Sequence, residues 1–285
     1  MVSELAITRR ELLAEAATLL RDAGVTDPRR EAARIWSGLE RTPLSVYPLD
    51  PDAIIAPART AAFLASVRRR ATGEPLAHVT GWAGFRHLTL RSDARALIPR
   101  PETEGLVDLV LARVRTGTVA DIGTGTGCIA LSLAVEGGFT QVVGIDLSPQ
   151  ALALAAENRR DIGARVALIR GDLTECLPAR SLDALVSNPP YLTTGEYGAL
   201  DASVRDWEPK LALAAGPDGL DAIGRLLADG RRVLRSGAWL ALEVDEARAG
   251  QCAARAGASG YTDVAVHTDL FGRERYLLAR RSDAE

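Results

Sequence analysis

Hydrophobic positions in the first 75 residues recur at the three- and four-residue spacing of amphipathic helices. Thr8 and Glu11 form the T-x-x-E pattern of a capping box, which predicts the start of the first helix. Asp27 and Pro28 predict a cap and a first-turn proline for the second helix. The three helices are expected at 9–23, 28–39 and 57–70. Such short helices predict a small bundle, residues 1–75, that docks a partner and carries no catalytic chemistry.

The pattern changes over residues 76–97, where the alternating stretch HLTLRSDARALI follows Gly84 and Phe85. Alternation of this kind predicts a β-hairpin. We interpret this segment as a linker between the helical part and the rest of the chain. The sequence IPRPETE at 98–104 comes next, and its two prolines predict the start of another helix.

From Thr118 onward, short apolar strands alternate with helical segments. This order is typical of a parallel sheet with helices on both faces. The expected strands are TVADI, QVVGID, RVALIRGD, LDALVS and AWLALEV, and the expected helices are CIALSLAVE, PQALALAAENRR and 218–235. A final pair, YTDVAVHT and RERYLLAR, predicts an antiparallel end. Residues 98–285 are therefore predicted to form a doubly wound, Rossmann-like α/β domain.

Composition and charge narrow the classes of partner. The 285 residues are 47% hydrophobic and 25% charged, as in ordinary globular proteins. No apolar run approaches the roughly 20 residues that a spanning helix needs, so no membrane association is expected. The start, MVSELAITRRELL, lacks the features of a secretory signal, which predicts a cytoplasmic location. A formal net charge of −3 argues against affinity that depends on neutralising phosphates, so no direct nucleic-acid partner is expected.

Cysteine and histidine are sparse. Three cysteines lie far apart without a C-x-x-C pair, and three histidines are equally scattered. We therefore predict no metal site and no histidine-based nucleophilic triad. We expect a monomer.

A glycine-rich loop, DIGTGTG at 121–127, separates the first strand of the α/β domain from its helix. Glycines let the backbone turn sharply and approach a ligand, while the helix start offers unpaired N–H groups. The G-x-G-x-G spacing differs from that of a dinucleotide fold and lacks the lysine of a P-loop. The residues predicted to bind a cofactor here are Asp121, Gly123, Thr124, Gly125, Thr126 and Gly127.

Two carboxylates follow at the ends of the next two strands. Asp146 is placed to accept the hydroxyl groups of a ribose, and Asp172 to accept the amino group of an adenine. Ligands of open α/β sheets bind at the carboxyl ends of parallel strands, so these groups are expected to meet. Together with the glycine loop they predict a nucleoside site without a phosphate grip. The cofactor that fits this description is S-adenosylmethionine.

A second loop, Asn188-Pro189-Pro190-Tyr191, follows the fourth strand. Proline has no N–H, so this turn presents oxygen acceptors without competing donors. The side-chain oxygen of Asn188 and the carbonyl of Pro189 could each accept one N–H of a planar amide or an exocyclic amine, and Tyr191 offers a face for stacking. We predict these three as catalytic residues. All four residues are predicted to bind substrate, and Asn188 is also predicted to border the cofactor.

These motifs resemble the HemK/PrmC family of protein-(glutamine-N5) methyltransferases, and the similarity covers nearly the whole chain. Its segments are RRRATGEPLAHVTG (68–81), ALIPRPETE (96–104), GTGTG, NPPY, DWEPKLALAAGPDGLDAI (206–223) and GRERYLLAR (272–280). The resemblance implies an S-adenosylmethionine-dependent enzyme that methylates the glutamine of the Gly-Gly-Gln tripeptide in class I peptide chain release factors. It also implies a helical N-terminal domain that helps to grip the release factor, a hairpin linker, and a class I methyltransferase domain.

The resemblance also implies roles for individual residues. Gly123 to Gly127 would hold the methionine part of the cofactor, Asp146 its ribose, and Leu173 beside Asp172 its adenine. The NPPY turn would hold the glutamine. Three further residues, Arg100, Glu102 and Glu104, would shape the substrate side of the pocket floor.

The chain departs from the family pattern in two places. Gly84 precedes Phe85 where an acidic residue is common, and residues 244–251 read VDEARAGQ where many members have a glycine-containing turn. Three alternatives stay open. The acceptor could be a ribosomal protein glutamine or a biosynthetic small molecule. It could be the exocyclic amine of a nucleic-acid base, which presents a similar NH2 group to an N-P-P-[YF] turn. The chain could also be a non-catalytic module that has kept the fold.

Overall fold

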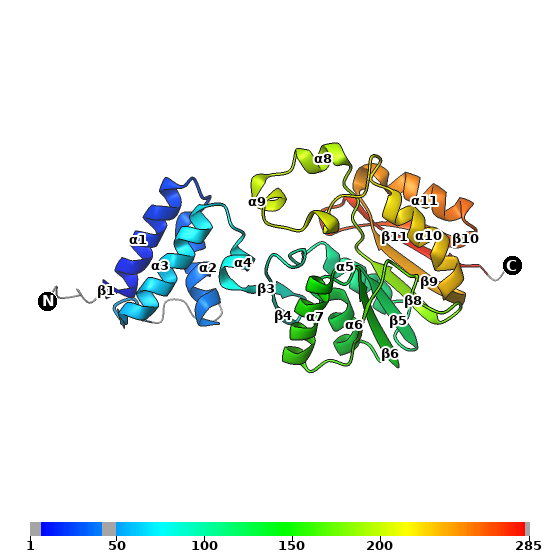
Figure 1. Cartoon of the computed structure of the whole chain (residues 1–285), viewed down its shortest axis with the longest axis horizontal. Coiled ribbons are helices and arrows are strands. Elements are labelled where there is room, and N and C mark those ends of the chain that lie inside the picture. Colours follow the sequence, from blue (N-terminus) through cyan, green and yellow to red (C-terminus); the bar gives the residue numbers. More distant parts are fainter. Residues whose placement is uncertain (1–6, 42–49, 283–285) are drawn as a thin grey trace. The chain divides into compact units, whose positions relative to one another are not determined.

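The computed structural model describes residues 7–41 and 50–282, and it divides the chain into two compact units (Figure 1). One unit comprises Met1–Trp82 with Asp201–Trp207, and the other comprises Ala83–Leu200 with Glu208–Glu285. The boundary after Trp82 lies inside the segment 76–97 that the sequence assigns to a linker.

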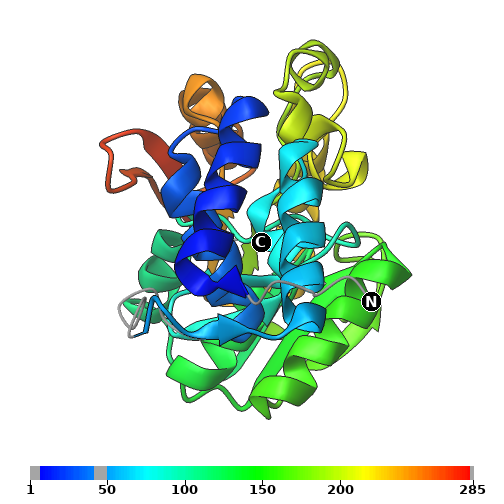
Figure 2. The same ribbon diagram turned by 90° about the vertical axis from the view of Figure 1, so that its left-hand side faces the viewer.

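Helices dominate the first unit. They are α1 (Arg9–Asp22), α2 (Pro28–Glu40), α3 (Pro57–Ala71), the short α4 (Leu76–Thr80) and α9 (Ala202–Arg205). The helices α1 and α3 lie side by side (Figure 2). A short antiparallel pair, β1 (Ile7–Thr8) and β2 (Ile54–Ile55), precedes α1 and α3. Buried apolar side chains of all three long helices form one core, in which the rings of Trp36 and Phe63 meet edge to face at 5.3 Å.

The helix starts in this unit agree with the sequence, with one correction. At α1 the capping box is complete: the backbone N–H of Glu11 donates to the Thr8 hydroxyl, and the backbone N–H of Thr8 donates to the Glu11 carboxylate. Pro28 occupies the first turn of α2 as predicted. Asp27, however, has a left-handed backbone (φ 49°) and makes no side-chain cap bond, so the prediction of an aspartate cap is wrong.

A seven-stranded sheet forms the centre of the second unit. Its strands are β5 (Thr118–Ile122), β6 (Gln141–Asp146), β7 (Ala167–Arg170), β8 (Leu182–Ser187), β9 (Leu234–Glu243), β10 (Tyr261–Thr268) and β11 (Glu274–Arg281). They lie in the order β10-β11-β9-β8-β5-β6-β7. The five strands from β9 to β7 are parallel, and β11 and β10 are antiparallel additions at one side.

Alternate strand residues point to opposite faces, and each face carries its own apolar core. Ala120 and Ile122 pack on the side covered by α10 (Asp221–Val233) and α11 (Ala249–Ala258). Val119 and Val186 pack on the side covered by α5 (Thr103–Leu111) and α6 (Cys128–Glu136). The remaining long helix, α7 (Pro149–Ile162), packs near β6 and β7. The predicted α/β class with helices on both faces is confirmed.

Some elements differ from the sequence prediction. The segment expected to be a hairpin begins with α4, and its strands are only β3 (Trp82–Phe85) and β4 (Leu88–Arg91). The helix α11 and the short segments α8 (Thr194–Gly198), α9, η2 (Lys210–Ala212) and η3 (Glu246–Arg248) were not predicted. Short helices such as α8 bury little, so their sequences carry no strong apolar period.

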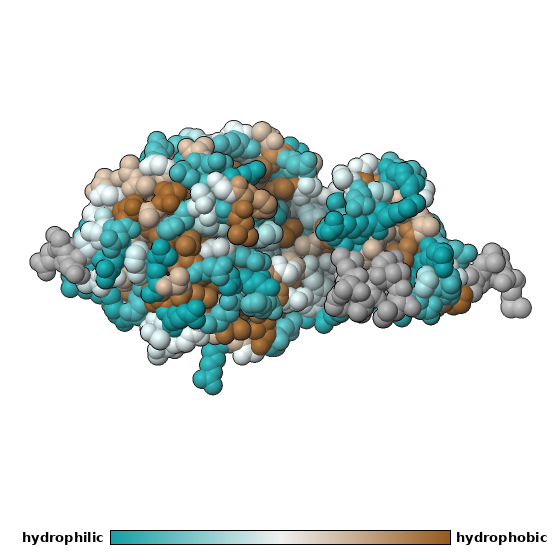
Figure 3. Space-filling view, turned by 180° about the vertical axis from the view of Figure 1, so that it is seen from behind, coloured by the Kyte–Doolittle hydropathy of each residue, from teal (hydrophilic) through white to brown (hydrophobic). Residues whose placement is uncertain are grey.

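The surface mixes polar and apolar residues, as the face in Figure 3 shows. Within the described residues, no helix combines the length and the hydropathy that crossing a bilayer would require. The most exposed large apolar side chains are Leu270 and Phe271, between β10 and β11.

Candidate active site

A cavity of about 540 Å³ opens at the carboxyl ends of the parallel strands, where α/β sheets bind their ligands. Its walls come from segments far apart in the sequence. Of the residues predicted from sequence to bind cofactor or substrate, those lining it are Arg100, Gly123, Thr124, Gly125, Thr126, Asp146, Asp172, Leu173, Asn188 and Pro190. The structure therefore gathers both chemistry-bearing loops around one cavity.

The glycine loop turns sharply between β5 and α6. Gly123 and Gly125 have φ values of 72° and 56°. L-residues that carry a side chain rarely adopt such a left-handed backbone, whereas glycine does so readily. A Cβ placed at Gly123 would meet nothing within 4 Å, and one at Gly125 nothing closer than 3.9 Å. The backbone N–H groups of Gly123 and Thr124 donate to the carbonyl of Ile145 at 2.8 and 2.9 Å, which fixes the loop on β6. The loop thus exposes bare backbone to the cavity.

Asp121 lies behind this loop and does not line the cavity. Its Oδ2 accepts hydrogen bonds from the Thr124 hydroxyl at 2.6 Å and from the backbone N–H of Ala130 at 3.1 Å. Complete burial raises the pKa of this carboxyl to about 7, against the lowering effect of those two bonds. Asp121 therefore braces the loop against α6 from below.

Asp146, at the end of β6, lines the cavity and supports it. Its Oδ2 accepts the N–H of Gly125 and its Oδ1 accepts the N–H of Ser148, both at 2.9 Å. Burial raises the pKa of Asp146, and hydrogen bonds from backbone N–H groups oppose that rise. Each carboxylate oxygen has a second lone pair, so both can still accept a ligand hydroxyl.

Asp172 and Leu173 follow β7 and form another part of the wall. Leu173 has a left-handed backbone with a φ of 47°, an uncommon conformation for this residue type. Asp172 Oδ2 accepts a hydrogen bond from Arg225 on α10 at 2.9 Å. The carboxylate assigned from sequence to an adenine amino group thus has an arginine partner, and Arg225 lines the cavity beside it.

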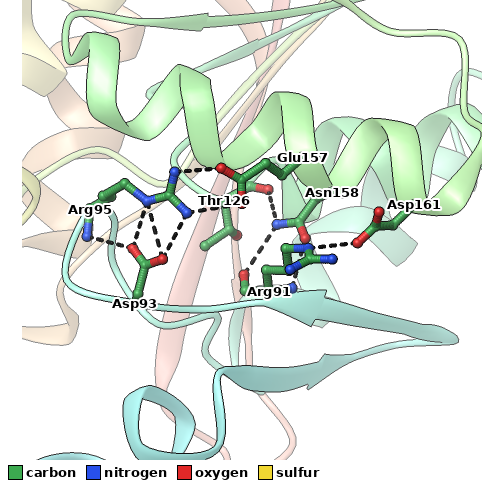
Figure 4. A network of polar contacts seen from close by, with 7 residues as sticks. All are labelled: Arg91, Asp93, Arg95, Thr126, Glu157, Asn158 and Asp161. Atoms are coloured by element: carbon green, nitrogen blue, oxygen red, sulfur yellow. Dashed lines mark hydrogen bonds and ion pairs between the residues drawn. The ribbon is translucent and has the colours of Figure 1, made fainter.

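A polar network fixes the other side of the glycine loop (Figure 4). Asn158 on α7 is buried, and its Nδ2 donates to the carbonyls of Thr126 at 2.9 Å and Arg91 at 3.2 Å. Its Oδ1 accepts the backbone N–H of Arg91 at 2.7 Å. Next to it, Arg95 pairs with both Asp93 and Glu157. Asn158 therefore connects the loop to the last residue of β4.

The NPPY turn directly follows β8, and its residues divide between two cavities. Asn188 and Pro190 line the larger cavity. Tyr191 lines a smaller one of about 240 Å³ together with Arg100, Glu102, Glu243 and Arg275. Pro189 lines neither. Among the residues that the structure describes, only Arg100 borders both cavities.

A chain of hydrogen bonds fixes the Asn188 side chain. Its Nδ2 donates to the hydroxyl oxygen of Thr103 at 3.0 Å, and that hydroxyl donates to Glu243 Oε2 at 2.7 Å. Thr103 and Glu243 are each 2% exposed. Because Nδ2 is used in this way, Oδ1 is the amide atom of Asn188 that can accept a bond from a ligand.

Burial also shifts the pKa values of two groups that line the smaller cavity, Glu243 and Tyr191. It raises the pKa of Glu243 to about 7, against the effects of the Thr103 bond and the nearby Arg275. Desolvation likewise raises the pKa of the Tyr191 hydroxyl to about 12, so this phenol is neutral at physiological pH. Arg100 is held by an ion pair with the buried Glu208.

Glu104 lies apart from the other residues of the IPRPETE segment. Its Oε1 accepts the backbone N–H of Arg86 at 2.8 Å, in the turn between β3 and β4, and it lines neither cavity. Gly127 also lies outside both linings. The binding roles assigned from sequence to Glu104, Gly127, Asp121 and Pro189 stay predictions.

Comparison with known proteins identifies the family. Residues 11–81 match the model of the PrmC N-terminal domain, and residues 102–205 match the methyltransferase small domain. Proteins named release factor glutamine methyltransferase from Moorella thermoacetica and Deinococcus radiodurans are each 42% identical to this chain. The alignments cover 97% and 96% of this chain and 100% and 98% of those proteins. The chain belongs to the release factor glutamine methyltransferase family.

A solved structure supports the fold. The crystal structure of a methyltransferase from Pyrococcus furiosus superposes with a TM-score of 0.52 at 17% identity, over 79% of this chain and 98% of that one. The family resemblance, the class I methyltransferase fold and S-adenosylmethionine as cofactor, all predicted from sequence, are confirmed.

The cavity of this release factor glutamine methyltransferase family member suits that cofactor. The open space above Gly123 and Gly125 would admit the amino-acid part against bare backbone, and Asp146 offers acceptors for ribose hydroxyls. Leu173 would contribute apolar surface for the adenine. Asn188 lines the same cavity, so a substrate amide at the NPPY turn would face the cofactor.

The sequence reading missed several site residues. Thr103 lies in the IPRPETE segment between Glu102 and Glu104, the two charged residues that were predicted to bind substrate. Glu243 ends β9 just as Asp146 ends β6, so the rule that strand ends carry function could have found it. Asn158 and Arg225 lie on helices whose apolar pattern gives no hint of their polar contacts.

Proposed function

We propose that this chain transfers the methyl group of S-adenosylmethionine to the side-chain amide nitrogen, N5, of a glutamine in peptide chain release factors. The glutamine is that of the Gly-Gly-Gln tripeptide in class I factors. The observation that carries this proposal is the orientation of Asn188, whose Nδ2 donates to Thr103 so that its Oδ1 remains the acceptor. The relatives' names support the same acceptor.

The chemistry requires orientation more than a base. An amide nitrogen is a poor nucleophile because its lone pair is delocalised into the carbonyl. Bound S-adenosylmethionine supplies an electrophilic methyl group on a sulfonium. Asn188 Oδ1 and the Pro189 carbonyl would accept the two N–H groups of the glutamine amide and hold its nitrogen in line for attack.

The same acceptors favour the charge that builds on nitrogen during attack. A positively charged nitrogen donates stronger hydrogen bonds than a neutral one, so the two bonds tighten in the transition state. As the N–CH3 bond forms and the S–CH3 bond breaks, S-adenosylhomocysteine is the leaving group. The nitrogen then passes its excess proton along its hydrogen bond to an accepting oxygen and from there to water. Water excluded from the cavity by the bound polypeptide would strengthen these bonds further.

Partners and location follow from this function. The helical unit would contribute to binding the release factor, and the enzyme would act as a cytoplasmic monomer without binding nucleic acid directly. Its formal net charge of −3 supports a protein partner over a phosphate backbone.

The experiment combines the purified protein with a class I release factor and S-adenosylmethionine carrying a labelled methyl group. We expect one methyl group per release factor, located on the tripeptide glutamine by mass spectrometry. A release factor with that glutamine changed to asparagine is the matched control and should stay unlabelled. Label in ribosomal protein, in a small metabolite or in nucleic acid, with none in the release factor, would contradict the proposal.

A further inference from the structure

A chain of two hydrogen bonds, here called the relay, links Asn188 through Thr103 to Glu243. Both bonds are donated in the same direction, toward Glu243. Asn188 Nδ2 donates to Thr103 at 3.0 Å, and Thr103 donates to Glu243 at 2.7 Å. The relay joins the end of β8, the first residue of α5 and the end of β9, and the sequence separations are 85 and 140 residues. Three separate elements therefore converge on the orientation of a single amide.

The direction of the relay follows from proton counting. A threonine hydroxyl has a single proton, and a carboxylate can only accept. With Glu243 ionised, the Thr103 proton goes to Glu243, and the Thr103 oxygen must accept from its other neighbour. Asn188 therefore turns its NH2 group toward Thr103 and its oxygen the other way.

Glu243 also lies near the opposite end of the turn. Tyr191 lines the smaller cavity together with Glu243, and the charges that face Glu243 include those of Arg275, which favours its ionisation, and Glu102, which opposes it. Asn188 is thus anchored through Thr103 on a buried carboxylate, and Tyr191 lies in the same cavity as that carboxylate.

We infer that Glu243, acting through Thr103, is a positioning residue that determines which atom of the Asn188 amide faces the substrate. The inference rests on the proposed function, because it assumes that the substrate presents N–H groups. When Glu243 is protonated, the direction of these hydrogen bonds is no longer fixed. A carboxylic acid can donate to Thr103, and Thr103 can then donate to Asn188 Oδ1. The Asn188 NH2 group would then face the N–H groups of the substrate, and both sides would be donors.

Because the orientation of Asn188 depends on the ionisation of Glu243, turnover depends on pH. The pKa of Glu243 lies near 7 because burial disfavours its charge, so the productive orientation gains population as pH rises through that value. Besides Thr103, the titratable and charged groups facing Glu243 are Glu102, Arg100, Arg275, Tyr191, Tyr276 and Cys128. Burial raises the pKa of the two phenols and of the thiol to about 12 each, well outside this window.

The test compares Thr103→Val with Thr103→Ser in labelled-methyl transfer to a release factor. Valine has the same shape without the hydroxyl, and we expect kcat to fall by roughly 10- to 100-fold, the usual cost of an unmade hydrogen bond at a reacting group. Serine restores the hydroxyl and should return kcat to within about threefold of the wild type. KM for the release factor and the dissociation constant for S-adenosylmethionine should change little, because the relay orients rather than binds. Thr174→Val, which removes another buried hydroxyl bonded to a carboxylate, Asp229, is the matched control and should keep wild-type kcat.

The pH profile separates orientation from folding. Wild-type kcat should rise between pH 6 and 8, whereas Glu243→Gln and Thr103→Val should be slow and lack that rise. A wild-type rate in Thr103→Val, failure of Thr103→Ser to recover, or an unchanged rise in Glu243→Gln would each overturn the inference. Transfer by the wild-type protein is measured before any variant. If the wild-type protein itself transfers no methyl group to the release factor, the proposed function fails.

Discussion

In the proposed function, single side chains would align the substrate and bind the cofactor. Asn188, Asp146 and Thr103 would act through specific hydrogen-bonding atoms, whereas Gly123 would act by leaving space for the ligand. This distinction allows substitutions that separate binding from chemistry.

Replacing Asn188 by alanine removes an acceptor from the substrate amide. We expect kcat for transfer to release factor to fall by about 100-fold or more, while cofactor affinity stays within a few fold, because the acceptor acts in the transition state. Single-turnover kinetics and calorimetry with S-adenosylmethionine measure the two quantities. Turnover at the wild-type rate would exclude the proposed role of Asn188.

Asp146→Ala is expected to weaken cofactor binding by roughly 10-fold or more, since it removes the ribose acceptor and frees the N–H groups of Gly125 and Ser148. Asp146→Asn keeps one acceptor oxygen and should lie between alanine and wild type. The measurement is the dissociation constant by calorimetry. Equal affinities for all three proteins would contradict the ribose assignment.

The sequence was informative about residues that belong to local motifs. The glycine loop, Asp146 and Asn188 were recognised because loops after parallel strands converge, and the structure places them around one cavity. Thr103 and Glu243 were not, because their bond spans 140 residues and leaves no periodic or motif signal. The arginine partner of Asp172 was invisible for the same reason.

At the scale of elements, α7 has a role beyond covering the sheet. Its Asn158 holds the carbonyl of Thr126 in the glycine loop and both backbone groups of Arg91 at the end of β4 (Figure 4). The position of the loop therefore depends on α7, which comes after α6 and β6 in the chain.

Asn158→Ala should lower the free energy of unfolding by about 1–3 kcal/mol, since it leaves buried backbone groups unpaired. It should also weaken binding of S-adenosylmethionine through the loosened loop. The neighbouring Glu157→Gln, which weakens a half-exposed ion pair with Arg95, is the control and should cost less than about 1 kcal/mol. Urea unfolding monitored by circular dichroism measures both. An Asn158→Ala protein as stable as Glu157→Gln would contradict this account of α7.

Element boundaries were predictable where pattern and turn chemistry agreed. The strand β6 and the helix α6 have the bounds read from the sequence, because apolar runs there end at glycine or aspartate. The helices α8, α9 and α11 were missed. The first two are short and bury nothing, and the residues that α11 buries, Ala249, Cys252 and Ala256, are all small.

At the scale of the whole molecule, two buried carboxyl groups connect the site to stability. Burial raises the pKa of Asp121 and of Glu243 to about 7 each, from ordinary values of 3.8 and 4.5. The folded state therefore binds more protons than the unfolded state between those values, so this contribution to stability decreases as pH rises toward 7.

We expect the Glu243→Gln variant to lack part of that decrease. The free energy of unfolding of the wild type, minus that of the variant, should therefore be smaller at pH 8 than at pH 5. Urea titrations at both pH values give the four numbers. A difference that grows with pH would show that Glu243 has a lowered pKa in the folded state.

The outermost strands of the sheet influence how copies of the molecule meet. The strand β7 has only four residues, and β10 changes register twice along its pairing with β11. Short and irregular borders are poor templates for a strand from another molecule. Both edge strands of the sheet thus disfavour pairing with a strand of another molecule. This protects a chain with a largely apolar interior against fibre formation at high concentration.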